Sequence, residues 1–185
     1  MKTAASPSLI AWPIATAEGE FIARYSAAGL AELDFPRPLV GRASPRAGIR
    51  NSPSSTLHPP SSPVPSAVLR TRHRLTVAAL QNVLAGRAPQ KLPPLDWSGT
   101  TEFQQAVWRE MLQLKPGQTR SYGEIARLIG RPRAVRAVGG ACGANPIPVL
   151  VPCHRVLAAG RRLGGFGGGL DWKRRLLARE GVVPA

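Results

Sequence analysis

The sequence holds few of the residues that form cysteine-based metal sites. Its 185 residues include two cysteines, Cys142 and Cys153, which stand eleven positions apart and make no CxxC pair. A cysteine-based zinc site is therefore not expected. The three histidines, His58, His73 and His154, are too scattered along the chain to indicate a metal cluster. The sequence thus predicts a protein without a bound metal.

Long apolar runs are lacking as well. No stretch reaches the ~18 apolar residues that a membrane span needs, so no membrane association is expected. Residues 9–17 are a weak copy of a signal peptide, but their apolar run is short and Pro13 interrupts it. We therefore favour a protein that is not secreted.

Acidic residues are scarce, with 10 Asp and Glu against 25 Lys and Arg and a net charge of +15. Residues 98–185 hold 14 Lys and Arg and 5 Asp and Glu, a net charge of +9. A basic surface of this size favours a polyanionic partner and makes the affinity strongly salt-dependent. Charge alone fits a soluble basic protein without such a partner equally well.

The N-terminal half divides into a patterned and an unpatterned region. Residues 12–35 predict strands, with residues 21–25 and 30–35 on either side of a hairpin turn at Ala27-Ala28-Gly29. Residues 36–66 are different, because these 31 residues contain 8 prolines and 7 serines and almost no apolar periodicity. Such a composition buries too little surface to offset its ordering entropy, so we expect a mobile loop or linker.

Helix signals begin after this segment. Apolar residues recur at helical spacing over residues 72–84, and Gly86 ends the pattern. Thr101-Glu102-Phe103-Gln104 is a capping-box signature that opens a second helix.

A pair of short helices is predicted further along. Ser121-Tyr122-Gly123-Glu124 is another capping box, and its helix runs to Gly130. Pro132 suits the first turn of the next helix, residues 133–141. Two short helices with a tight glycine-containing turn form a helix-turn-helix layout, although helix pairs are also common in protein cores.

The second helix of this pair is almost bare of side chains. A helix that recognises bases in the major groove normally carries polar side chains, whereas a helix of small residues lets its backbone approach a surface, including the minor groove of DNA. Arg136 is the one long cation in residues 134–144. The small residues are Ala134, Ala137, Gly139, Gly140, Ala141, Gly143 and Ala144.

The residues around Cys153 form a pattern that favours nucleophilic chemistry. Cys153 follows an apolar run that predicts a strand end, and His154 comes directly after it. Thiolate is the nucleophile, and a neighbouring imidazole is a common acceptor for the thiol proton. The alternative is a buried structural cysteine. Cys142 illustrates that alternative, because it lies among glycines and alanines with no base beside it.

The surroundings of Cys153 resemble one protein family over residues 95–185. The resemblance rests on the ordered series Phe103-Gln104, Val107-Trp108, Pro116-Gly117-Gln118-Thr119, Ser121-Tyr122-Gly123, Ile125-Ala126, Arg136-Ala137-Val138-Gly139, Asn145-Pro146, Pro152-Cys153-His154-Arg155-Val156, Gly167-Gly168-Gly169-Leu170 and Glu180-Gly181. With this series the stretch resembles the O6-alkylguanine-DNA alkyltransferases, also called methylated-DNA–protein-cysteine methyltransferases.

The resemblance implies a fold and a reaction. The fold is of the α/β (α+β) class, with a small sheet-containing domain at residues 1–97 and a mostly helical, winged helix-turn-helix-like domain at residues 98–185 that carries the active-site cysteine. The reaction is the irreversible transfer of an alkyl group from O6 of guanine in DNA to the sulfur. The cysteine is both catalyst and acceptor, so each molecule acts once and no cofactor is needed.

The resemblance also assigns the catalytic residues. Cys153 receives the alkyl group, and His154 removes its proton through a bridging water, since adjacent strand residues point to opposite faces. Glu180 holds His154 and stabilises its cation. Asn145 ties the second helix of the pair to the cysteine strand.

The target base must leave the stack, because a cysteine cannot approach the alkyl carbon in line inside a duplex. By resemblance, Tyr122 helps to rotate the base outward and is a candidate proton donor to N3, while Arg136 fills the gap in the stack. Ala134, Ala137 and Gly139 are the predicted backbone contacts to DNA. Tyr122, Val156 and Gly167 are predicted to line the base pocket, with the glycine-rich residues 164–169 as its lip.

The expected partner is double-stranded DNA containing O6-alkylguanine, bound by a monomer. A reactive thiol needs a reducing compartment, so a cytoplasmic protein is expected. The main alternative is a non-catalytic, alkyltransferase-like protein that binds the lesion, but such proteins lack the cysteine. A transcription regulator is disfavoured by the bare helix, and a cysteine hydrolase by the series of motifs.

Overall fold

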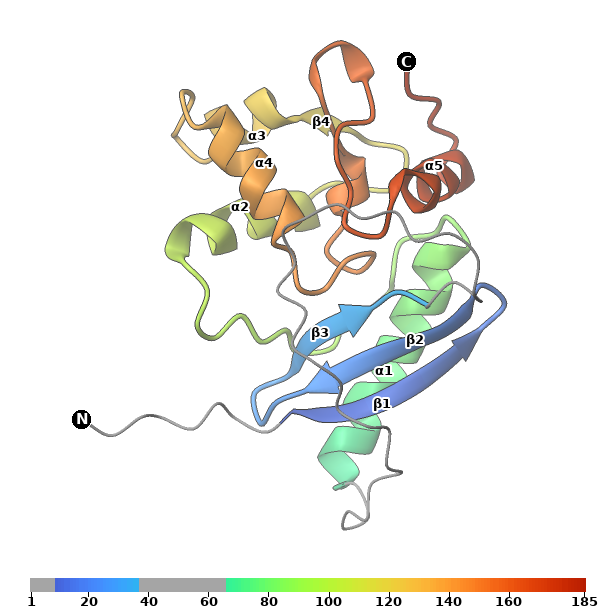
Figure 1. Cartoon of the computed structure of the whole chain (residues 1–185). Helices are drawn as coiled ribbons and strands as arrows, with labels where there is room; N and C mark the ends of the chain where they lie inside the picture. The colour runs from blue at the N-terminus through green and yellow to red at the C-terminus, as the bar shows by residue number, and fades with distance from the viewer. Residues whose placement is uncertain (1–8, 37–65) are drawn as a thin grey trace, which may run out of the picture.

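Three antiparallel strands and one long helix form the first part of the protein (Figure 1). The computed structural model describes residues 9–36 and 66–185. The strands are β1 (Ile10–Thr16), β2 (Gly19–Tyr25) and β3 (Leu30–Asp34), in the order β1-β2-β3. The segment that weakly resembles a signal peptide is therefore largely strand β1, and Ile14 within it is buried.

The sheet has the two-residue periodicity expected of a half-buried surface. Alternate residues Phe21, Ala23 and Tyr25 of β2 are buried, whereas Ile22 and Arg24 are only partly covered. The predicted hairpin between β2 and β3 is confirmed, because the N–H of Ser26 donates to the carbonyl of Gly29 at 2.9 Å.

Helix α1 (Ala67–Leu84) covers one face of this sheet, as Figure 1 shows. It starts five residues earlier than the apolar pattern predicts, because the side chain of Ser66 accepts a hydrogen bond from the N–H of Leu69 and caps the helix. Ser66 was assigned to the predicted mobile segment, and that boundary was wrong. Residues 37–65 lie outside the described residues.

The second part of the protein is mostly helical. Together with the antiparallel sheet of the first part, it confirms the predicted α/β (α+β) fold class. Its helices are α2 (Glu102–Leu112), α3 (Tyr122–Leu128), α4 (Val135–Gly143) and α5 (Leu170–Arg179), with the 3-10 turns η1 (Cys153–Arg155) and η2 (Ala159–Arg161). Two short strands, β4 (Arg120–Ser121) and β5 (Val156–Leu157), pair in parallel. No helix within the described residues is long and apolar enough to cross a membrane.

Both predicted capping boxes are present. Thr101 and Gln104 cap α2 reciprocally, and Ser121 and Glu124 do the same for α3. Because Ser121 also pairs in β4, its cap fixes the point where the chain turns from strand into helix at Tyr122.

Helix α4 begins later than predicted. Pro132 and Arg133 occupy a turn closed by a 2.8 Å hydrogen bond from the N–H of Ala134 to the carbonyl of Arg131. Proline favours the second position of such a turn as well as the first turn of a helix. The helix therefore starts at Val135 and has no side-chain cap.

The core runs continuously through both parts. Trp108 of α2 is fully buried, and its indole N–H donates to the carbonyl of Ala141 in α4 at 2.8 Å. The same apolar cluster contains Phe21 and Leu33 of the sheet and Val151 beside the cysteine turn. The domain boundary at residues 97 and 98 stays a prediction, and packing across it is extensive.

Candidate active site around Cys153

Cys153 opens the 3-10 turn η1 and is not at the end of a regular strand. Val151 forms only an isolated bridge with Pro148, and the N–H of Cys153 donates to the carbonyl of Val151 at 2.8 Å. The strand prediction failed because an apolar run that lies wholly in a core has the same composition as a buried strand. The strand-based argument for a bridging water therefore no longer applies, and the route of the proton from Cys153 to His154 stays a prediction.

The sulfur of Cys153 is buried, with 7% of the residue exposed. Burial raises the pKa of this thiol, and a hydrogen bond from Asn145 together with the charge of Lys173 opposes that rise. The resting residue is therefore a protonated thiol, and a base would have to remove its proton for the sulfur to act as a nucleophile.

Asn145 connects the end of α4 to the cysteine turn. Its Nδ2 donates to the carbonyl of Val151 at 2.8 Å and to Sγ of Cys153 at 3.3 Å. Its Oδ1 accepts from the N–H of Ile147 at 3.1 Å. The structure thus places the amide between the predicted DNA-facing helix and Cys153, the predicted nucleophile.

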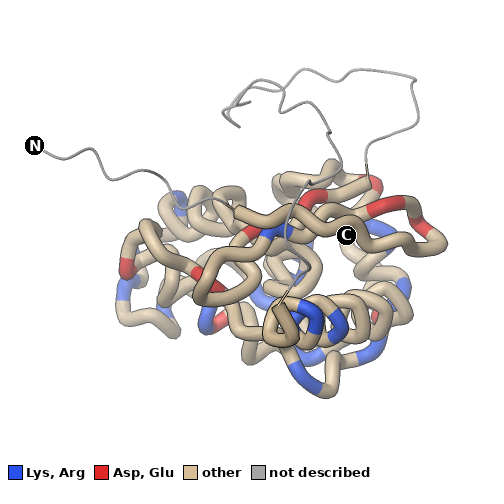
Figure 2. The backbone as a smooth tube through the Cα atoms, turned by 90° about the horizontal axis from the view of Figure 1, so that it is seen from below, with Lys and Arg blue, Asp and Glu red and all other residues tan. Residues whose placement is uncertain are grey.

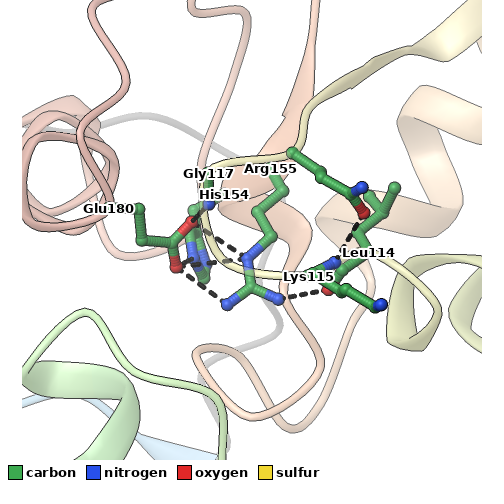
Figure 3. A network of polar contacts seen from close by, with 7 residues as sticks. Leu114, Lys115, Gly117, His154, Arg155 and Glu180 are labelled. Carbon is green, nitrogen blue, oxygen red and sulfur yellow. Dashed lines mark hydrogen bonds and ion pairs between the residues drawn. The ribbon is translucent and has the colours of Figure 1, made fainter.

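His154 and Glu180 meet in the interior, as Figure 3 shows. His154 is fully buried, and its Nε2 lies 3.0 Å from Oε1 of Glu180, whose side chain is 1% exposed. Burial would raise the pKa of Glu180, but hydrogen bonds from His154 and Arg155 lower it to about 2. The carboxylate is therefore ionised at neutral pH.

This carboxylate determines which nitrogen of His154 is free. Burial lowers the pKa of His154 despite the opposing effect of Glu180, so the imidazole is neutral at pH 7. An ionised carboxylate only accepts hydrogen bonds, so Nε2 carries the hydrogen and Nδ1 carries the lone pair. Nδ1 is buried and has no hydrogen-bond partner among the described residues. The imidazole therefore presents an unused acceptor.

Tyr122 begins α3 and lies against the glycine-rich lip. A Cβ atom at Gly164 would lie 2.8 Å from the Tyr122 hydroxyl, and Gly164 has a φ of +64°, so both space and backbone conformation require glycine there. Burial and then the neighbouring Cys142 and Cys153 raise the pKa of Tyr122, which keeps its hydroxyl protonated. Gly167 lies further along the same loop and is exposed, and Val156 is buried directly after η1.

The predicted DNA-facing residues lie on the outer side of α4. Arg136 and Ala137 are exposed and Ala134 and Gly139 partly so, while Val138 is buried against the core. Among the described residues, Arg136 has no ion-pair or hydrogen-bond partner. In Figure 2, basic segments of the tube outnumber acidic ones, in line with the net charge.

The sequence around this site is similar to that of known proteins. A family model described as "6-O-methylguanine DNA methyltransferase, DNA binding domain" matches residues 102–182. A methylated-DNA–protein-cysteine methyltransferase of Mycobacterium tuberculosis is 51% identical over 104 residues, or 56% of this chain and 62% of that protein. One of Haemophilus influenzae is 52% identical over 89 residues, or 48% of this chain and 49% of that protein. The matched chain thus spans about three fifths or less of these relatives.

Solved structures match over a longer stretch. The crystal structure of Mycobacterium tuberculosis OGT in complex with DNA is 36% identical, with a TM-score of 0.66, and the match covers 91% of this chain and 90% of that one. The chain belongs to the O6-methylguanine methyltransferase family. All the catalytic, DNA-contact and base-pocket residues predicted for it lie within residues 102–182.

Two polar residues of this O6-methylguanine methyltransferase family member were not assigned a role from sequence. Arg155 is 4% exposed and binds Glu180 through Nε at 3.0 Å and Nη2 at 2.8 Å, while Nη1 donates to the carbonyl of Leu114 (Figure 3). Arg155 stands within the motif that carries the resemblance, but nothing in the sequence links it to Glu180, which lies 25 residues away.

Lys173 is the second. It is fully buried, and its Nζ donates to the carbonyls of Val156 at 2.7 Å, Leu163 and Gly165. Burial lowers its pKa to about 8. One signal was available, because Lys173 stands three and four residues before Leu176 and Leu177, on the buried stripe of α5. The lysine joins the segment after η1 to the start of the lip.

Proposed function

We propose that the protein repairs DNA by transferring the alkyl group of an O6-alkylguanine to Sγ of Cys153. The observation that carries this proposal is the buried series Cys153, His154 and Glu180, in which His154, a neutral imidazole with a free acceptor that is paired with Glu180, directly follows the protonated thiol in the chain. The names of its relatives, methylated-DNA–protein-cysteine methyltransferases, support the reaction class.

His154 takes the thiol proton through a bridging water. Nδ1 has the lone pair for this step, and the ionised Glu180 stabilises the imidazolium that forms. Arg155 keeps Glu180 ionised and in place. Burial makes the thiol of Cys153 harder to deprotonate, and the base and its carboxylate compensate for this when the substrate is bound.

The transfer itself is a displacement at the alkyl carbon. The S–C bond forms as the C–O6 bond breaks, and the guanine leaves with its electron pair. A proton must reach the guanine, and Tyr122 is the candidate donor, since its raised pKa keeps its hydroxyl protonated at neutral pH. The net result is a thioether on Cys153 and an unmodified guanine, so each protein molecule reacts once.

The substrate base reaches the sulfur by leaving the duplex. Arg136 enters the stack in its place, and the small side chains of Ala134, Ala137 and Gly139 let the backbone of α4 approach the DNA. Tyr122, Val156 and Gly167 line the pocket that receives the base. The protein acts in the cytoplasm as a monomer on double-stranded DNA that contains O6-alkylguanine.

Intact-protein mass spectrometry tests this function directly. The protein is mixed with a duplex that carries one O6-methylguanine, and a stoichiometric gain of one methylene mass located on Cys153 is expected. Cys153→Ser should show no gain. Cys142→Ser is the matched control and should react normally, because burial raises the pKa of Cys142 to about 12 and no base lies beside it.

Lesion-selective binding without any mass gain would overturn the transfer and favour a protein that only binds the lesion. A mass gain located on Cys142 would also contradict the proposal.

A further inference from the structure

Strand β3 contacts the active site from the N-terminal part of the chain. It is an edge strand of its sheet, and the N–H of Leu33 donates to the carbonyl of Pro146 at 2.9 Å. Pro146 directly follows Asn145, whose amide holds the turn of Cys153. One backbone hydrogen bond therefore links the sheet to the segment that positions the nucleophile.

Phe35, which follows β3, contacts the glycine-rich lip. Its ring lies 5.7 Å from that of Phe166 in an edge-to-face arrangement, and 5.0 Å from that of Trp172. A Cβ atom at Gly168 would lie 2.5 Å from Phe35, so the loop backbone runs directly over this ring. Phe35 therefore contacts both Phe166 and Gly168, which form the middle of the lip.

The composition of the lip makes this contact decisive. Five of the six residues 164–169 are glycine, and Phe166 provides the only side chain beyond a hydrogen atom. Glycine loses more conformational freedom on folding than any other residue, so such a loop is not ordered by its own preferences. Lys173 and Tyr122 hold its first residues, Gly164 and Gly165. Phe166 and Gly168 are held against Phe35.

We infer that Phe35 is a positioning residue that fixes the lip of the base pocket and so determines how large an alkyl group reaches Cys153. This inference rests on the transfer reaction proposed above. A lip held against the ring fits a small substituent closely. A loosened lip would place a methylated base less well and would admit a bulkier substituent.

The first test compares two substrates. Phe35→Leu keeps an apolar residue but removes the ring, and we expect single-turnover transfer from O6-methylguanine in a duplex to slow by on the order of tenfold, because the base is held less well. Transfer from O6-benzylguanine in the same duplex should slow less, so that the benzyl-to-methyl ratio of rates rises. Phe35→Tyr keeps the ring and should restore the ratio of the unaltered protein.

A double-variant cycle tests the contact itself. Gly168→Ala places a methyl group where the Phe35 ring lies, so it should displace the lip and also slow the transfer. Combined with Phe35→Leu, the ring atoms that the methyl group meets are gone. The double variant should therefore transfer the methyl group faster than Gly168→Ala alone. If the two sites were independent, the effects of the two substitutions would simply add, and the double variant would be slower.

Hydrogen exchange separates this role from a loss of stability. Phe35→Leu should speed amide exchange in residues 164–169 and leave α2 unchanged. Trp12→Leu is the matched control, because it removes another aromatic contact of the same sheet, the stacking on His73 at 4.2 Å. It should change neither the rate ratio nor exchange in the lip.

Unchanged exchange and an unchanged rate ratio in Phe35→Leu would overturn the inference, as would the same changes in Trp12→Leu. If the unaltered protein transfers no alkyl group, the proposed function fails, and the specificity role fails with it. Exchange in the lip would still decide whether Phe35 positions it.

Discussion

The charged groups around Glu180 are buried and paired with one another, whereas the charge on the outer face of α4 is exposed and unpaired among the described residues. In the cluster, the carboxylate is 1% exposed and is paired with both Arg155 and His154. On α4, Arg136 is exposed and no described residue pairs with it. The cluster is complete within the protein, whereas the face of α4 is suited to a partner that brings its own negative charge. The two regions should therefore respond differently to the same kind of substitution.

Glu180→Gln should have the largest effect, because it leaves Arg155 buried without a counter-charge. We expect a loss of about 3–5 kcal/mol in the free energy of unfolding, measured by denaturant titration, and transfer at least a hundredfold slower. Glu124→Gln is the matched control, since Glu124 caps α3 at the surface, and it should lose about 1 kcal/mol or less. Equal losses in the two variants would remove the distinction between the regions.

Acid should destabilise the cluster in a defined pH range. Burial lowers the pKa of His154, and the pKa of Glu180 falls to about 2 from its ordinary value of 4.5. Below these ordinary values the unfolded chain binds more protons than the folded one, so stability falls as pH falls. The fall should begin below pH 6.5 with His154 and continue from pH 4.5 toward 2 with Glu180, which contributes on the order of 3 kcal/mol.

Unfolding free energies measured from pH 7 to 3 check this expectation. In Glu180→Gln the part of the fall below pH 4.5 should be smaller than in the unaltered protein. A stability that is flat over this range would mean that the pairing of Glu180 differs little between the folded and unfolded chains.

Arg136→Ala should affect DNA and leave the fold intact. Transfer from a lesion in a duplex should slow by about tenfold, because unstacking is no longer compensated, while the free energy of unfolding stays within ~0.5 kcal/mol. Transfer from the same lesion in a single strand should change much less. Arg174→Ala on α5 is the control, and it should leave both rates unchanged.

A similar loss on both kinds of DNA would assign Arg136 to a phosphate contact. That outcome would keep the contrast in charge but remove the proposed role in the stack.

Ser121→Ala should have the smallest effect. It removes the hydroxyl that accepts from the N–H of Glu124 at 3.2 Å and caps α3. The loss should be about 1 kcal/mol, seen as a lower Tm in a thermal melt. The cap also fixes the position of Tyr122, the first residue of α3. The transfer rate should therefore fall slightly more than expected from the smaller fraction of folded protein alone. Thr101→Ala at the cap of α2 is the control for stability without that effect.

The features that the sequence predicted well depend on neighbours in the chain. The capping boxes at Thr101 and Ser121 are determined by residues three apart, so each could be recognised without knowledge of the rest of the fold. The order of the family's motifs predicted Cys153, His154 and Glu180 as catalytic residues, and the structure brings the last two together at 3.0 Å.

The features that were missed depend on contacts that are distant in sequence. The apolar run before Cys153 has the composition of a strand, but in the fold it forms only an isolated bridge at Val151, and Cys153 opens a 3-10 turn. Arg155 becomes significant through Glu180, and Phe35 through Phe166, which follows it by 131 residues. A single sequence shows no periodicity for such pairs, because tertiary packing alone creates them.

The ion pairs between the β1–β2 turn and α5 have a consequence for the order in which the protein folds. Glu18 forms ion pairs with Arg175 and Arg179, and the second pair joins residues 161 positions apart. Contacts that close such long loops form late during folding. Since Glu180 directly follows Arg179, the carboxylate that orients His154 is expected to be among the last groups to settle. Until then His154 lacks the carboxylate that orients its ring, so under the proposed mechanism Cys153 gains its full reactivity only once the two ends of the chain have come together.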